Sequence, residues 1–229
     1  MGIGHTRWAT HGKADEKNSH PHLSMNKEVV LVHNGIIENF ADLKNFLQEK
    51  GYSFYSDTDT EVAVNLIEYF YLKEKNILNT LFLVQRELKG SYAFAIMFEG
   101  DANTLYAMRK DSPLIVGKEK NSFYIASDIS AFLDYTNEIY ALENKEILTL
   151  SENEIHIYNK NKEEVKRSSG IADLDQSRIH KGEYLHFMEK EIFEQPQAVK
   201  DTLLYACGKE NDDFSYEAFS MSEKDFRDI

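Results

Sequence analysis

The first half of the chain places apolar residues at helical spacing. They recur every three or four residues in three segments, and Gly51 follows the first segment where a helix C-cap is expected. Thr58 or Thr60 is suited to cap the second segment with its hydroxyl oxygen. The pattern therefore predicts helices over 38–50, around the apolar face Val62, Leu66, Ile67 and Phe70, and over 77–88.

Short runs of β-branched and aromatic residues dominate the middle of the chain and occur twice before it. Residues 28–33 form a buried-strand pattern that ends in an Asn34-Gly35 turn, and a strand is also predicted over 52–55. A helix over 128–135 interrupts the later runs. Helices grouped beside antiparallel strands indicate an α+β fold and not the alternating order of a parallel sheet. The later predicted strands cover 91–98, 104–108, 114–116, 122–126, 139–142, 146–150 and 154–158.

The last third of the chain loses this regularity. Residues 159–182 are polar and aperiodic, which indicates a long loop or the edge of the compact domain. A helix is predicted over 186–194, and Pro196 can begin a further helical stretch that reaches about Tyr205. Residues 208–229 are rich in acidic side chains and are interpreted as a tail or an interdomain linker.

The composition and charge of the chain limit the kinds of partner that it is expected to bind. A chain of 229 residues with 42% hydrophobic residues can bury a real core, and at ~150 residues per domain the simplest division is one domain with an appendage. The formal net charge of −13 repels phosphate backbones and anionic lipid, so nucleic-acid and membrane partners are disfavoured. The sequence shows no apolar run long enough for a membrane span, and its single cysteine fits a reducing compartment such as the cytoplasm.

The histidines suggest a metal site and the cysteine suggests a catalytic nucleophile, but the surrounding sequence supports neither. Five side chains near the start of the chain are of types that bind metal ions: His5, His11, Asp15, His20 and His22. No helical His-x-x-x-His spacing is present, and Pro21 separates the last pair, so hydrogen-bonded loop histidines and no metal are expected. Cys207 lies in no recognisable nucleophile motif and is expected to be a bystander thiol.

Two short segments suit recognition of a free amino acid. Arg7 has a guanidinium group that can bind a carboxylate, and the adjacent Trp8 can form an aromatic wall. Asp59 can pair with an ammonium group. A structural ion pair and a core tryptophan are the alternative. Asn34 and Gly35 can each donate an N–H to a developing oxyanion, although Asn-Gly between apolar runs is also a preferred hairpin turn.

Five motifs occur in a fixed order along the chain. They are Gly4-His-Thr-Arg-Trp-Ala-Thr-His-Gly12, Asn18-Ser-His-Pro-His22, His33-Asn-Gly-Ile-Ile-Glu-Asn39, Ser56-Asp-Thr-Asp-Thr-Glu61 and Gly182-Glu-Tyr-x-His-Phe-Met-x-Lys-Glu-Ile-Phe-Glu-Gln-Pro196. Together they resemble the glutaminase half of the glutamine:fructose-6-phosphate aminotransferase family, over nearly the whole chain to about Leu203. Amidophosphoribosyltransferases share this class II glutaminase fold, but the first and last motifs look like the aminotransferases.

The resemblance implies an N-terminal-nucleophile hydrolase fold, an αββα sandwich of two antiparallel sheets between helical layers. It implies a glutamine amidotransferase domain over 1–182, the helical end of that domain over 183–207, and an acidic linker over 208–229. The implied reaction is hydrolysis of the side-chain amide of L-glutamine, with the ammonia delivered to fructose 6-phosphate in an isomerase domain. No cofactor is implied.

Residue roles carried over by motif place a glutamine site near the start of the chain. Arg7 is expected to bind the α-carboxylate of glutamine and Asp59 its α-ammonium. Asn34 and Gly35 are expected to form the oxyanion hole. Three further residues are expected to shape the pocket: Trp8, Thr10 and His11.

The nucleophile of this family is an N-terminal cysteine whose own amine serves as the base. Position 1 here is Met1, followed by Gly2, so the chain is expected to lack the family's N-terminal segment and to be inactive alone. Two hypotheses follow: a truncated glutaminase that retains its glutamine pocket, or a non-catalytic or regulatory remnant that binds glutamine or partner chains. Sheet edges exposed by missing strands favour reduced stability or homo-oligomer formation.

Overall fold

The computed structural model describes residues 1–7, 12–120, 122–152, 154–172 and 180–207. These residues belong to two compact units, Met1–Asp173 and Leu174–Ile229. Three of the predicted pocket residues, Trp8, Thr10 and His11, lie outside the described residues, as does the predicted linker over 208–229.

The helices of the first unit follow the apolar spacing of the sequence. They are α1 (Phe40–Glu49), α2 (Asp59–Glu74) and α3 (Ile77–Glu87). The C-cap of α1 is Lys50 and not Gly51, which is the next residue; Gly51 ends the helix with a φ of 91°, and its N–H donates to the Gln48 carbonyl at 2.9 Å. Of the two proposed caps for α2, Thr58 is the N-cap, and its side chain accepts from the Glu61 N–H.

Two antiparallel sheets complete the first unit, in agreement with the α+β prediction. The larger has the strand order β1-β2-β3-β4-β8-β9-β10 and the smaller the order β11-β7-β5-β6. The strands of the larger sheet are β1 (His22–Leu23), β2 (Val29–Ile37), β3 (Gly90–Phe98), β4 (Asp101–Lys110), β8 (Ile147–Leu150), β9 (Ile155–Tyr158) and β10 (Glu164–Val165). Those of the smaller sheet are β5 (Ile115–Glu119), β6 (Ser122–Ala126), β7 (Glu138–Ala141) and β11 (Gly170–Ile171).

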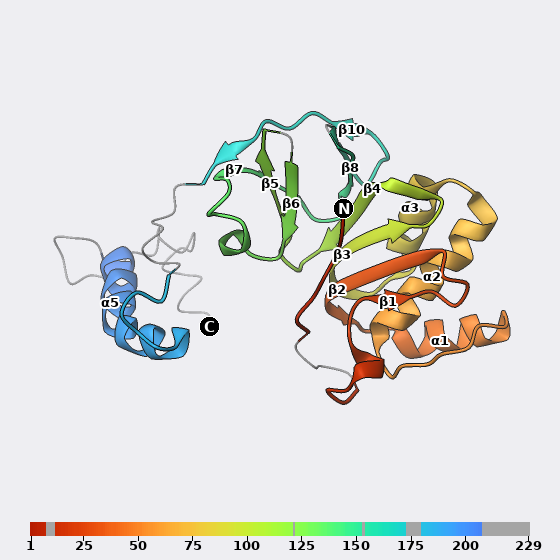
Figure 1. The fold of residues 1–229 in the computed structure, drawn as a ribbon, viewed down its shortest axis with the longest axis horizontal. Coiled ribbons are helices and arrows are strands. Elements are labelled where there is room, and N and C mark those ends of the chain that lie inside the picture. The colour runs from red at the N-terminus through yellow and green to blue at the C-terminus, as the bar shows by residue number, and fades with distance from the viewer. Residues whose placement is uncertain (8–11, 121, 153, 173–179, 208–229) are drawn as a thin grey trace, which may run out of the picture. The chain divides into compact units, whose positions relative to one another are not determined.

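The larger sheet is covered on both faces. Figure 1 shows α1, α2 and α3 on one side of it and β5, β6 and β7 on the other. Along β3 the large side chains Tyr92, Phe94 and Ile96 pack in the core shared with the helices, whereas Ala93 packs in the core shared with the smaller sheet. Because successive side chains of a strand point to opposite faces of the sheet, β3 packs large residues in one core and a small residue in the other.

Three local predictions were wrong. The strand predicted over 28–33 continues through Asn34 and Gly35 to Ile37, so no turn occurs there. Residues 52–55 are not a strand. The Tyr55 N–H donates to a Glu61 carboxylate oxygen at 2.8 Å and not to a neighbouring strand. The helix predicted over 128–135 is reduced to a short 3-10 helix, η2 (Ile129–Ala131). A second 3-10 helix, η1, covers Glu16–Asn18.

In residues 180–207 of the second unit, a single helix, α5 (Phe187–Cys207), covers the region where two helical stretches were predicted. Pro196 lies inside this helix and does not begin a new one. The Tyr184 ring stacks on Phe193 with 5.7 Å between ring centroids, which fastens the segment before the helix to its second turn. Within the described ranges, no helix combines the length and the apolar character needed to cross a membrane.

Candidate functional site

Four of the predicted site residues line one cavity of ≈ 320 Å³ in the first unit: Arg7, Asn34, Gly35 and Asp59. They come from the N-terminal segment, from β2 and from the first turn of α2, so the fold brings together residues that are far apart in sequence. The remaining lining residues are His5, His20, His33, Ile36, Thr58, Thr60 and Ser91.

Asn34 and Gly35 lie inside β2, directly opposite Ala93 and Tyr92 of β3. Gly35 has a φ of 133°, and a Cβ atom there would lie 2.2 Å from the Ser91 carbonyl oxygen. The glycine is therefore required by close contact between strands and not by a hairpin turn. The alternative of an Asn-Gly hairpin turn is thus excluded by the structure.

Asp59 connects the start of α2 to the strand that carries Asn34 and Gly35. Asp59 is only 4% exposed, and its Oδ2 accepts a hydrogen bond of 2.8 Å from the Ile37 N–H. The same oxygen lies 4.0 Å from His33 Nδ1. A carboxylate in the first turn of a helix is stabilised by the helix dipole, so the site holds a buried negative charge in a fixed position.

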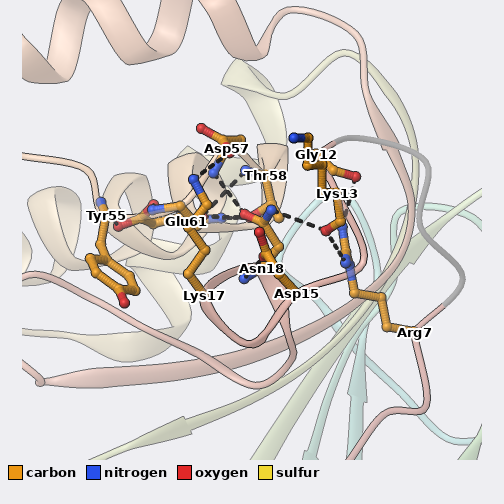
Figure 2. Close-up of polar contacts among 11 residues, drawn as sticks. Arg7, Gly12, Lys13, Asp15, Lys17, Asn18, Tyr55, Asp57, Thr58 and Glu61 are labelled. Carbon is orange, nitrogen blue, oxygen red and sulfur yellow. Dashed lines mark hydrogen bonds and ion pairs between the residues drawn. The ribbon is translucent and has the colours of Figure 1, made fainter.

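Residues 12–18 are tied to the start of α2 through Asn18 (Figure 2). Asn18 is fully buried; its Nδ2 donates to the Lys13 carbonyl at 3.1 Å, and its Oδ1 accepts from the Asp57 N–H at 2.9 Å. Arg7 Nη1 donates to the same Lys13 carbonyl at 2.9 Å. An exposed ion pair of 2.6 Å between Lys17 and Asp57 lies beside this link. The position of Arg7 thus depends on the loop that precedes Asp59.

The N-terminal turn of α2 carries a second set of hydrogen bonds, also drawn in Figure 2. Glu61 accepts from the Tyr55 N–H at 2.8 Å and from the Ser56 N–H at 2.6 Å, while its own N–H donates to Thr58 Oγ1 at 3.2 Å. Thr58 thus caps the helix, and the Glu61 carboxylate holds the two backbone N–H groups of Tyr55 and Ser56 that precede the cap. Thr58 Oγ1 also lies 3.1 Å from His22 Nε2, which fastens β1 to the cap.

Three histidines pack together beside the cavity. The His5 and His20 rings stack at 4.6 Å, and the His20 and His22 rings lie edge to face at 5.1 Å. Burial lowers the pKa of all three, and for His20 the added repulsion of His5 brings the pKa to about 3. The rings are therefore neutral at pH 7. Among the described residues that line the cavity, Arg7 is the one side chain with a permanent positive charge.

The structure does not gather these side chains into a metal site. In the part of the chain that it describes, no group of three or more His, Cys, Asp or Glu side chains could hold a metal ion. The His5 ring is hydrogen-bonded to the Asn34 side chain instead, an interaction that opposes the lowering of its pKa. Asn34 is thus within reach of both the histidine cluster and the cavity.

Several lining residues escaped prediction as site residues. His33, Thr58 and Thr60 lie within the recognised motifs next to the predicted residues, and adjacency was the available signal. Ser91 has no such signal, because its place depends on the pairing of Ile36 with Ser91 across β2 and β3. Pairing between segments this far apart in sequence is set by the fold.

A second cavity, of ≈ 660 Å³, adjoins the first between the two sheets. His5, His33 and Asn34 line both cavities, and residues 1–6 line the second together with residues of β3 and β6. The candidate site therefore opens toward the space between the sheets.

The match to a family model settles the family of this chain. Residues 5–134 match the model of the glutamine amidotransferase domain, a range that contains Arg7, Asn34, Gly35 and Asp59. The chain belongs to the glutamine amidotransferase domain family. The matched range includes β1 to β6, α1 to α3 and the whole of the ≈ 320 Å³ cavity lining.

Relatives of this amidotransferase domain are longer proteins. The chain is 43% identical over 203 residues to the isomerizing glutamine–fructose-6-phosphate aminotransferase of Clostridium acetobutylicum, covering 89% of this chain and 33% of the relative. It is 42% identical over 228 residues to the Aquifex aeolicus protein of the same name, covering 100% of this chain and 37% of the relative. The chain therefore spans about a third of the length of these relatives.

Solved structures agree on the fold of the amidotransferase domain. The glutamine phosphoribosylpyrophosphate amidotransferase of B. subtilis superposes with a TM-score of 0.58 at 26% identity, covering 68% of this chain and 34% of that one. A regulatory enzyme of purine biosynthesis gives a TM-score of 0.59 at 25% identity, with the same coverage of 68% and 34%. The predicted N-terminal-nucleophile hydrolase fold with two antiparallel sheets is confirmed.

Proposed function

We propose that this domain binds L-glutamine in the ≈ 320 Å³ cavity and is the glutaminase part of a glutamine-dependent fructose-6-phosphate aminotransferase. One observation carries the proposal. A guanidinium group, a buried carboxylate and two candidate oxyanion donors line the same small cavity, at Arg7, Asp59, Asn34 and Gly35. The names of the longer relatives supply the identity of the ammonia acceptor.

The charged groups suit the two ends of a free amino acid. A guanidinium group has a planar fork of N–H donors and binds a carboxylate with two parallel hydrogen bonds. We assign the α-carboxylate of glutamine to Arg7 and its α-ammonium to the carboxylate of the buried Asp59. A peptide-bound glutamine lacks both charges, so this pair selects the free amino acid.

The uncharged donors suit the side-chain amide. When a nucleophile attacks the amide carbon, the oxygen acquires negative charge, and N–H groups already in place stabilise it. We assign this role to the Asn34 side-chain amide and the Gly35 N–H, which adjoin each other on β2. Trp8, Thr10 and His11, outside the described residues, are proposed to complete the pocket.

We infer that these 229 residues do not supply the nucleophile for amide hydrolysis. The printed sequence contains one cysteine, Cys207, and the described residues that line the cavity include none. We propose that these 229 residues bind glutamine without releasing ammonia, and that hydrolysis and transfer to fructose 6-phosphate belong to a longer polypeptide. The single cysteine fits a reducing compartment, so we place this function in the cytoplasm.

Calorimetric titration of the chain with L-glutamine tests the proposal. The informative variants are Arg7→Ala and Asp59→Asn; the latter keeps an oxygen that can accept from the Ile37 N–H while removing the charge. Each should weaken glutamine binding by ~10-fold or more, the effect of one charged hydrogen bond. Asp42→Asn is the matched control for Asp59→Asn, because Asp42 lies in the first turn of α1.

The outcomes separate the alternatives. Binding that weakens in Arg7→Ala and Asp59→Asn but not in Asp42→Asn supports the glutamine site. Absence of glutamine binding, or equal binding by all variants, refutes it and favours a remnant with another partner. Release of ammonia above background by the 229-residue chain would refute the proposal that this chain does not hydrolyse glutamine.

A further inference from the structure

Another small cavity lies on the first unit, away from the proposed glutamine site. Its volume is ≈ 320 Å³, and it is lined by residues of α3, the end of β4, the loop before β8 and the loop after β9. It shares no lining residue with the candidate glutamine cavity. We call it the basic cavity, after its four cationic residues Arg86, Lys110, Lys145 and Lys160.

The charge of the basic cavity is opposite to that of the chain. The formal net charge is −13, yet four cations and no carboxylate line this cavity. Two nearby carboxylates are held elsewhere: Asp111 accepts from Asn144 Nδ2 at 2.7 Å, and Glu146 pairs with Arg167 at 2.7 Å. Among the described residues, no ion pair involves any of the four cations.

A buried amide donor adds a second, independent observation. Gln85 lines the basic cavity, and its Nε2 is buried without a hydrogen-bond partner among the described residues. Buried polar groups in native proteins nearly always have a partner. An N–H donor left this way calls for an acceptor from outside the chain.

The backbone positions of two of the lysines around the basic cavity are fixed by the fold. Lys110 is the last residue of β4, next to the core of the larger sheet. Lys145 has a φ of 66°, and its N–H donates to the Arg109 carbonyl at 2.8 Å. The two lysines therefore start from defined backbone positions at neighbouring strands, which lowers the entropy cost of ordering them around a ligand.

From these observations we propose that the basic cavity binds a phosphorylated small molecule. Arginine and lysine are the side chains that recognise phosphate, and four of them together match an anion with more than one negative charge. Gln85 supplies a further donor, and the Phe82 ring supplies an apolar wall for the organic part of the ligand. The net charge of −13 opposes a long polyanion such as nucleic acid.

Calorimetric titration at low ionic strength, with inorganic phosphate, pyrophosphate and citrate as probes, tests this proposal. We expect pyrophosphate to bind more tightly than phosphate and citrate to bind least, with affinities that fall as salt is added. Lys110→Gln and Lys145→Gln should each weaken pyrophosphate binding by ~10-fold. Gln85→Leu should weaken it without any change of charge.

Lys120→Gln is the matched control, because Lys120 is an exposed lysine in the turn between β5 and β6 and does not line the basic cavity. Its affinity for pyrophosphate should equal that of the unaltered chain. Equal losses in Lys120→Gln and Lys145→Gln would show diffuse attraction and overturn the site. Absence of pyrophosphate binding, or citrate binding as tight as pyrophosphate, would also overturn it. L-Glutamine titration of the same variants checks their folding independently.

Discussion

Gly35 is the residue in the proposed glutamine site at which a side chain has no room. An added Cβ would lie 2.2 Å from the Ser91 carbonyl oxygen and 2.9 Å from Ser112 Oγ, and the φ of 133° is itself unfavourable for any other residue. We expect Gly35→Ala to lower the free energy of unfolding by more than ~3 kcal/mol, because β2 and β3 must separate. Urea denaturation measures this difference.

Gly51 provides the matched control for that substitution. It also has a positive φ, of 91°, but an added Cβ would meet nothing within 4 Å. Gly51→Ala should therefore cost only about 1 kcal/mol, the effect of backbone strain alone. If the two alanine variants were equally stable, the close contact between strands at Gly35 would not be what requires the glycine.

At the scale of elements, the N-terminus of α2 links stability to the site. Thr58 caps the helix, is 5% exposed and precedes Asp59. Thr58→Ala should cost about 1 kcal/mol of stability and also weaken glutamine binding, because the first turn loses its anchor. Asn76→Ala removes the equivalent cap of α3, where Asn76 Oδ1 accepts from the Asn79 N–H at 2.9 Å. It should cost similar stability and leave glutamine binding unchanged; weakened binding in both variants would contradict a local effect.

The elements that the sequence predicts well are those whose signal is local. The helix over Ile77–Glu87 follows the apolar spacing of its own residues, and the strand over Ser122–Ala126 follows its own β-branched and aromatic run. The errors arise where distant residues decide the backbone. Pairing with β3 keeps Asn34 and Gly35 extended, and the Glu61 carboxylate takes the N–H of Tyr55 that a strand would have used.

The two cavities also differ in whether local sequence indicates them. Motifs single out Arg7, Asn34, Gly35 and Asp59, and the fold places all four around one cavity. Nothing local in the sequence indicates the basic cavity, because Arg86, Lys110, Lys145 and Lys160 are scattered and become neighbours only through α3 and the larger sheet. Scattered lysines in a sequence are normally solvated surface residues.

At the scale of the whole molecule, the histidine cluster makes stability depend on pH. Burial lowers the pKa of His5, His20 and His22, that of His20 to about 3. Between the ordinary histidine pKa of about 6.5 and these values, the unfolded chain binds more protons than the folded one. The contribution of the neutral histidine cluster to the free energy of unfolding should therefore be fully present above about pH 7 and should fall as the pH is lowered toward 5.

Two variants isolate this contribution. His20→Asn keeps an acceptor for the His33 N–H, which now donates to His20 Nδ1 at 3.3 Å, and should reduce the loss of melting temperature between pH 7.5 and pH 5. His156 is a control of opposite sign, because hydrogen bonds from its ring to Glu164 and Glu154 raise its pKa. His156→Gln should instead make the loss at low pH larger. An unchanged pH profile in His20→Asn would contradict a role for the cluster.

The central claim is that four residues scattered along the first 59 positions recognise one free glutamine molecule. The most direct measurement is a crystal structure of the 229-residue chain grown with L-glutamine. The account predicts the α-carboxylate on Arg7, the α-ammonium on Asp59, and the side-chain amide oxygen facing Asn34 and Gly35. Glutamine bound elsewhere, or bound in this cavity with its charged ends away from Arg7 and Asp59, would contradict it.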